Sequence, residues 1–100
     1  MKKFSLLLMS ILISGCATSE KYNQKLNTWL ESPKDDLIMS WGIPDDSYTL
    51  DNGKELITYK RSNTSYYNGT SYHYYCNTTF TIENSNIVDW KWEGNNCVSD

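Results

Sequence analysis

The 100-residue chain has one histidine and two prolines, and it lacks an apolar run of the roughly 18 residues that a permanent transmembrane helix needs. It also lacks a Gly-x-Ser-x-Gly elbow, a metal-ligand spacing of cysteine and histidine, and the Asp-rich pattern of a calcium loop. His73 has no neighbouring motif that would mark a catalytic pair, so a surface histidine is the simpler interpretation. These absences favour a protein that is not an enzyme and that uses no cofactor or metal ion.

Basic residues are scarce as well. Nine Lys and Arg residues face twelve Asp and Glu residues, which gives a formal net charge of −3. If the first fifteen residues are removed, Lys2 and Lys3 leave with them, and seven basic residues then face twelve acidic ones for a charge of −5. A negative body has no electrostatic reason to seek nucleic acid. We therefore expect no nucleic-acid partner.

The first sixteen residues have the features of an export signal that ends in a lipid-accepting cysteine. Two lysines at positions 2 and 3 precede an apolar segment over residues 4–13, and Ile-Ser-Gly-Cys then occupies positions 13–16. This tetrad resembles the lipobox of bacterial lipoproteins. The resemblance implies a signal peptide over residues 1–15 and lipid chains on Cys16 that attach the protein to a membrane. An ordinary secretory signal is the alternative.

Ala17 follows this cysteine, where enteric-type lipoproteins that stay at the inner membrane carry an aspartate. The resemblance therefore implies the outer membrane, with a lipid-anchored body that faces the periplasm. Residues 16–21 are expected to form the acylated cysteine and a short polar tether. Residues 22–100 are enough for one small domain.

Two further cysteines, Cys76 and Cys97, lie in a chain that is predicted to leave the cytoplasm. In an oxidising compartment such a pair indicates a disulfide. Closing a loop of about 20 residues would stabilise the domain by roughly 3 kcal/mol in the chain-entropy model. Two free thiols are the alternative.

Two helical patterns come first in the domain. Between residues 20 and 31, apolar side chains at helical spacing form one face. These residues are Tyr22, Leu26, Trp29 and Leu30. A second helix is predicted with Ser32 as N-cap and Pro33 as its first residue, and Gly42 should end it.

The remainder is typical of strands. Asn52-Gly53 between two strand-like segments predicts a hairpin with a type I′ turn. Residues 62–71 show no periodicity and are expected to form an exposed loop. Residues 72–82 alternate between two faces, with the even-numbered side chains toward the core. A turn at residues 84–86 leads to a last strand with three core-facing residues. These are Val88, Trp90 and Trp92.

The expected fold is therefore α+β, with two short N-terminal helices packed on a three- or four-stranded antiparallel sheet. Three segments of the chain carry a resemblance to a known family: residues 35–44, 56–59 and 80–87. In this order they resemble small outer-membrane lipoproteins of the barrel-assembly lipoprotein E (small protein A) type, which have a β-lactamase-inhibitor-like fold. The resemblance implies a role in outer-membrane assembly or maintenance, although related folds also serve as protein inhibitors. The cysteine pair and the segment 62–71 depart from that family pattern.

Eight tyrosines and four tryptophans are many for so short a chain. We expect the tryptophans and the even-numbered strand residues to fill the core. Tyrosine beside Ser, Asn and Gly is also the composition of adaptable protein-binding surfaces. The candidate partner-binding residues are Tyr66, Tyr67, Tyr72 and Tyr75.

Three classes of function remain open at this point. The first is a non-catalytic lipoprotein that binds or positions another envelope protein. The second is an inhibitor or immunity-type lipoprotein that blocks a periplasmic or incoming enzyme. The third is a small hydrolase that uses the aspartates. The sequence does not specify the oligomeric state.

Overall fold

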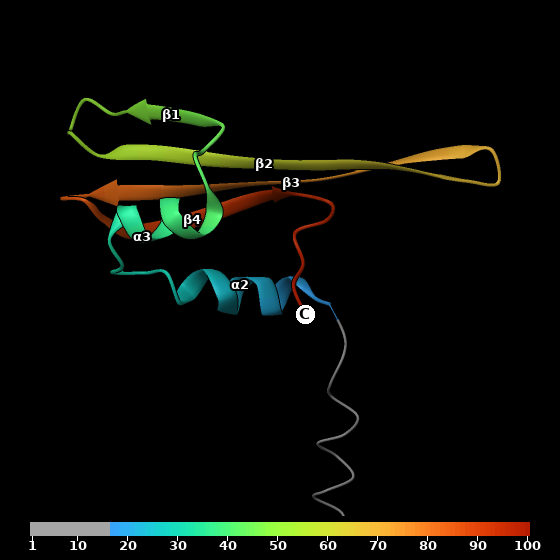
Figure 1. The fold of residues 1–100 in the computed structure, drawn as a ribbon, viewed down its shortest axis with the longest axis horizontal. Coiled ribbons are helices and arrows are strands. Elements are labelled where there is room, and N and C mark those ends of the chain that lie inside the picture. The colour runs from blue at the N-terminus through green and yellow to red at the C-terminus, as the bar shows by residue number, and fades with distance from the viewer. Residues whose placement is uncertain (1–16) are drawn as a thin grey trace, which may run out of the picture.

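The computed structural model describes residues 17–100, so the predicted signal peptide and the lipidation site at Cys16 lie outside the described residues. The α+β class is confirmed, because in residues 17–100 two helices precede one antiparallel sheet with the strand order β1-β2-β3-β4 (Figure 1). Neither helix in residues 17–100 has the length and apolar character that crossing a membrane requires. The elements are α2 (Ser19–Asn27), α3 (Lys34–Trp41), β1 (Asp46–Thr49), β2 (Glu55–Tyr67), β3 (Thr70–Glu83) and β4 (Asn86–Gly94).

One face of the sheet carries the hydrophobic core. Ile57, Phe80 and Ile87 of three successive strands are completely buried. Leu26 of α2 and Leu37 of α3 are also completely buried and belong to the same cluster. Burying one such side chain stabilises the fold by about 1.5–3 kcal/mol. This cluster therefore joins both helices to the strands.

Hydrogen bonds add direction to this packing. The hydroxyl groups of Tyr22 and the buried Thr78 share a hydrogen bond of 2.7 Å. The indole N–H of Trp92 donates to the side-chain oxygen of Asn23 at 2.7 Å. Both bonds run from α2 to the sheet, so they fix the rotation of the helix as well as its position.

Helix α2 begins at Ser19, within the segment that was expected to be a tether. The reason is local: the Thr18 side chain accepts a hydrogen bond from the Lys21 N–H at 3.0 Å. The Thr18 backbone also exchanges hydrogen bonds with Ser99 near the other end of the chain. The tether prediction is thus wrong for residues 18–21, which are part of the folded body.

The link between the helices is bound to the edge of β4. The Glu31 N–H donates to the Ile87 carbonyl at 2.7 Å, and the Ile87 N–H donates to the Ser32 carbonyl at 2.9 Å. Helix α2 therefore stops before the predicted residue 31. Helix α3 begins one residue later than predicted, with Pro33 rather than Ser32 as its N-cap. Its end at Gly42 is confirmed, where a φ of 92° suits a residue without Cβ.

The hairpin of β1 and β2 is confirmed, but its predicted turn type is wrong. The Leu50 N–H donates to the Lys54 carbonyl at 2.7 Å, and the Gly53 N–H donates to the Leu50 carbonyl at 2.9 Å. Of the Asn52-Gly53 pair, only Gly53 has a positive φ, at 90°. A two-residue type I′ turn needs positive φ at both positions, so this connection is the longer kind with one left-handed glycine.

A bulge changes which residues of β4 are buried. The pairing of β3 with β4 shifts between Thr81 and Ile82, so that Ile82 pairs with Ile87 and Val88 becomes the extra residue. Ile87 is completely buried, and the prediction that Val88 faces the core is wrong for this reason. The tryptophans pack against the core as predicted. They are Trp90 and Trp92.

Residues 62–71 differ most from the prediction, because they continue β2 and β3 instead of forming a loop. The two strands pair without a break as far as Tyr67 and Thr70. Asn68 and Gly69 join them with φ values of 52° and 78°, as a type I′ turn requires. Figure 1 shows this hairpin projecting well beyond the other two strands. We refer to residues 62–75 as the ribbon.

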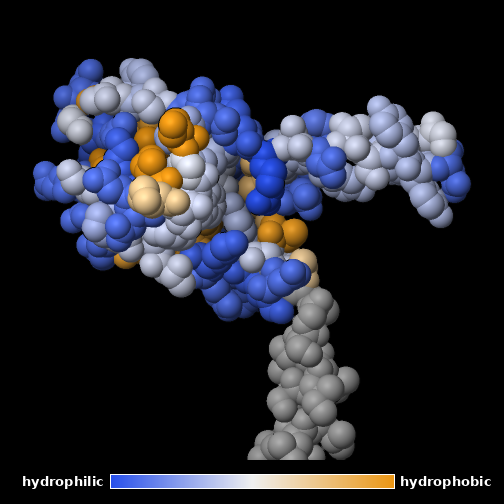
Figure 2. All heavy atoms as spheres, viewed as in Figure 1, coloured by the Kyte–Doolittle hydropathy of each residue, from blue (hydrophilic) through white to orange (hydrophobic). Residues whose placement is uncertain are grey.

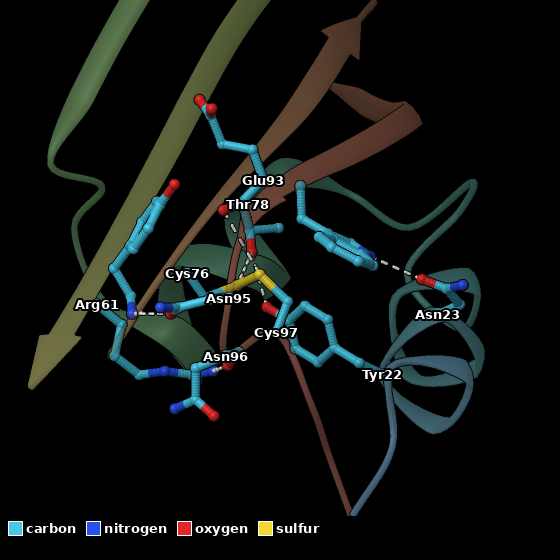
Figure 3. The surroundings of a disulfide bond; sticks show 11 residues. Tyr22, Asn23, Arg61, Cys76, Thr78, Glu93, Asn95, Asn96 and Cys97 are labelled. Atoms are coloured by element: carbon cyan, nitrogen blue, oxygen red, sulfur yellow. Dashed lines mark hydrogen bonds between the residues drawn. A yellow bond between two sulfur atoms is a disulfide. The ribbon is translucent and has the colours of Figure 1, made fainter. Parts of the chain in front are cut away.

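The disulfide between Cys76 and Cys97 is confirmed, with the two Cα atoms 5.0 Å apart (Figure 3). Cys76 pairs with Gly94, the last residue of β4, so the bond lies where the sheet narrows to two strands. Gly94 has a φ of 143°, and a Cβ there would overlap the carbonyl oxygen of Tyr75. The chain can therefore turn at Gly94 and bring Cys97 back to Cys76.

Two asparagines continue the pairing for one step after β4 ends. The Tyr75 N–H donates to the side-chain oxygen of Asn95 at 2.8 Å, and the Asn96 N–H donates to the Tyr75 carbonyl at 3.0 Å. The Asn95 side-chain amide also donates to the His73 carbonyl at 2.9 Å. These bonds and the disulfide together fix the direction in which the ribbon leaves the body.

Replacing both cysteines (Cys76→Ser with Cys97→Ser) is expected to lower the free energy of unfolding by roughly 3 kcal/mol, because the unfolded chain regains the freedom of a closed loop. Urea denaturation of the variant and of the oxidised protein measures this difference. The reduced native sequence is the control and should unfold at the same urea concentration as the variant. Equal stability of oxidised and reduced protein would contradict the structural role.

Candidate functional site

The ribbon combines exposure with a complete absence of formal charge. No Asp, Glu, Lys or Arg occurs between Arg61 and Glu83, and nearly every residue of the ribbon is exposed. Figure 2 shows it as a narrow arm beside a more strongly coloured body. Exposed strands are usually protected by charges, prolines or bulges. This ribbon has none of these, which is typical of a surface that contacts another molecule.

The first face of the ribbon carries Tyr67, Tyr72 and Tyr74. In the register of the hairpin, Tyr72 lies opposite Ser65 and Tyr74 lies opposite Asn63. These tyrosines are 67%, 44% and 37% exposed. The prediction that the even-numbered residues Tyr72 and Tyr74 fill the core is wrong, because the helices do not extend beneath the ribbon. We call these three residues the tyrosine face.

The second face carries Tyr66, His73 and Tyr75. The His73 and Tyr75 rings are stacked with centroids 6.1 Å apart and planes 20° from parallel. The Thr64 hydroxyl lies 3.2 Å from Nδ1 of His73 across the two strands. Thr64 and His73 are both exposed to water, so the pair has no sheltered geometry for acid–base chemistry.

The four tyrosines proposed from the sequence therefore share one hairpin but not one face. Tyr67 and Tyr72 lie on the tyrosine face, whereas Tyr66 and Tyr75 lie on the opposite side. Sequence reasoning missed Tyr74 as a surface residue. The missed signal was the Asn68-Gly69 pair, which marks a hairpin turn and would have placed residues 62–75 on two alternating strands.

A cleft of about 390 Å³ lies at the base of the ribbon, on the side of the tyrosine face. Its walls include Trp41, Ile43, Tyr59 and Arg61. The Ile43 side chain is 86% exposed and stands at the rim. Arg61 alternates along β2 in phase with Tyr67, so cleft and tyrosine face form one continuous surface. We call this surface the ribbon corner.

Two interactions shape the walls of this cleft. The Tyr59 hydroxyl donates to the Gly42 carbonyl at 2.8 Å, which ties the end of α3 to the sheet. Partial burial, followed by the negative charge of Asp45, raises the pKa of Tyr59 above its ordinary value. The Arg61 guanidinium lies 6.0 Å from the centre of the Tyr22 ring, which is within the range of a cation–π interaction (both residues are labelled in Figure 3).

The ribbon corner offers aromatic rings, one exposed aliphatic side chain and the charged groups of Asp45, Lys60 and Arg61. Within residues 17–100 no group of three or more His, Cys, Asp or Glu residues could hold a metal ion.

Comparisons of this chain with protein-family models, with curated proteins and with solved structures find no match. The resemblance to the barrel-assembly lipoproteins therefore stays a prediction that rests on short sequence segments.

Replacing residues 64–73 with Asn-Gly should shorten the ribbon without damaging the body. The replacement joins Asn63 to Tyr74, a directly opposed pair that can flank a two-residue turn. The removed residues are exposed, so the free energy of unfolding should stay within about 1 kcal/mol of the intact protein. Urea denaturation checks this. A loss of more than about 3 kcal/mol would show that the ribbon is part of the folding unit.

Proposed function

We propose that this protein is a non-catalytic lipoprotein of the outer membrane, anchored through Cys16, that binds or positions another envelope protein. In this proposal the two helices packed on the sheet are a scaffold, and the ribbon corner is the contact surface. The partner is expected among proteins of outer-membrane assembly or maintenance, as the family resemblance implies. The body faces the periplasm.

The observation that carries the proposal is the uncharged, exposed, tyrosine-rich ribbon on a rigid base. Tyrosine provides a large contact area with few rotatable bonds, so little side-chain entropy is lost on binding. The disulfide and the Asn95 contacts hold the base of the ribbon before any partner arrives. Such preorganisation lowers the entropic cost of association.

The cleft supplies a second type of contact beside the ribbon. Ile43 offers apolar surface at its rim and Trp41 lines its wall. Interfaces concentrate binding energy where an aromatic or aliphatic anchor enters a pocket. A partner that fills the corner would therefore touch the tyrosine face and the cleft together.

An inhibitor of a periplasmic or incoming enzyme is the second candidate. The observation that favours it is the shape of the ribbon, which is only two strands wide and ends in the tight Asn68-Gly69 turn. A projection of this kind can enter the cleft of an enzyme. The identity of the protein bound at the ribbon separates the two candidates, because an inhibitor would bind an enzyme rather than a fixed envelope component.

The lipid anchor can be tested directly in cells supplied with a fatty-acid probe. Native protein should take up the label, and Cys16→Ala should not, because the acyl chains are attached to the Cys16 residue. The double variant Cys76→Ser with Cys97→Ser is the matched control and should keep the label. An unlabelled native protein, or equal labelling of Cys16→Ala, would contradict the anchor.

The contact surface can be tested with a photoreactive phenylalanine at Tyr67. Tyr48 on β1 is the matched control position, because it is 65% exposed and Tyr67 is 67% exposed. We expect illumination of living cells to attach a defined envelope protein at position 67 and not at position 48. Equal capture at both positions, or capture at neither, would count against the ribbon corner as the contact surface.

A further inference from the structure

The ribbon also has two long edges, which the proposed function does not use. Strand β1 pairs with β2 only as far as Thr58, and the Lys60 N–H is bound by the Asp45 carboxylate. From residue 61 to the turn at residue 68, no strand of the described chain lies beside the outer edge of β2. We call residues 61–67 the free edge.

The register determines which backbone groups of the free edge point outward. Tyr67 and Thr70 flank the two-residue turn, so their backbone N–H and C=O groups hydrogen-bond to each other. Every second opposed pair along the hairpin is bonded in the same way. The N–H and C=O groups of the residues between them point away from β3. On the free edge these residues are Ser62, Thr64 and Tyr66.

We propose that the free edge pairs with the free edge of a second copy of this chain, in antiparallel orientation about a two-fold axis at Thr64. Thr64 is the midpoint of residues 61–67, so this register uses all three outward-facing residues of each copy. Thr64 then lies opposite Thr64 of the second copy, and Ser62 lies opposite Tyr66. The two ribbons become one four-stranded sheet.

Side-chain size fits this register. Within one ribbon, Tyr66 already lies opposite Ser71, and Ser62 lies opposite Tyr75. Across the two-fold axis Tyr66 would meet Ser62 of the second copy, so that each large ring has a small residue on either side. On the other face, Tyr67 would lie opposite Arg61 of the second copy and beside the aliphatic part of its side chain, since that guanidinium already lies near the Tyr22 ring of its own chain.

The distribution of charge favours contact between two copies at the ribbon rather than between their bodies. Without residues 1–15 the chain carries a net charge of −5, so two bodies repel each other. The ribbon carries no Asp, Glu, Lys or Arg and can approach another ribbon without that cost. Antiparallel pairing also places the two bodies at opposite ends of the joined ribbons. The pairing covers the free edge, so its backbone groups can no longer pair with further chains and cause aggregation.

The test uses the full-length chain in its own membranes with Thr64→Cys. His73→Cys is the matched control, because His73 lies directly opposite Thr64 in the hairpin but on the other edge. Mild oxidation followed by non-reducing electrophoresis should convert Thr64→Cys to a disulfide-linked dimer and leave His73→Cys and the native protein as monomers. A monomeric Thr64→Cys, or equal dimer formation by His73→Cys, would overturn the proposal.

A second measurement uses proline. The Thr64 N–H points outward, so Thr64→Pro leaves the hairpin bonds intact but removes two bonds across the two-fold axis. Sedimentation of the detergent-purified chain should show self-association weakened by more than about tenfold for Thr64→Pro and unchanged for His73→Pro. Native protein that sediments as a monomer would overturn the proposal. Capture of another protein at Tyr67 would survive in Thr64→Pro, so failure of this inference is distinguishable from failure of the proposed function.

Discussion

The rest of this structure depends on the place where β4 ends and the sheet narrows to two strands. We call this place the join. On the side of the body, β2, β3, β4 and the two helices of residues 17–100 share one core, and β1 only pairs with the edge of β2. On the side of the ribbon, only β2 and β3 continue. The Cys76–Cys97 disulfide and the Asn95 hydrogen bonds hold β3 there in place of a neighbouring strand. Gly94 makes this possible, because only a residue without Cβ can turn so close to the Tyr75 carbonyl. The join thus separates a part of the chain that folds by burial from a part that is available for contact.

The body could be predicted from the sequence because burial leaves a pattern there. Alternation from Cys76 to Ile82 and the apolar face of α2 both follow from packing against one core. The errors have local physical causes. Thr18 starts α2 early by capping it, and the bonds of Glu31 to Ile87 end it early. The bulge at Val88 could not be read from alternation alone, since alternation assumes an unbroken pairing.

The ribbon could not be predicted in the same way, because neither of its faces is buried and so its residues follow no hydrophobic period. Its tyrosines were identified from composition, which is a property of the segment as a whole. Their division between two faces depends on the register of β2 with β3, which the Asn68-Gly69 turn sets. The cleft at the base is lined by both Ile43 and Arg61, which lie in different elements of the chain. A short stretch of sequence does not show that the fold brings them to one cleft.

An arm without formal charge also has a kinetic consequence. Electrostatic steering accelerates encounters between proteins of opposite charge, and salt removes that advantage. The ribbon itself adds nothing to such steering, so the charged body alone sets the long-range field that an approaching partner meets. Once the ribbon touches its partner, the contacts of its uncharged side chains are little weakened by salt. The ribbon is suited to a surrounding whose ionic strength is not constant.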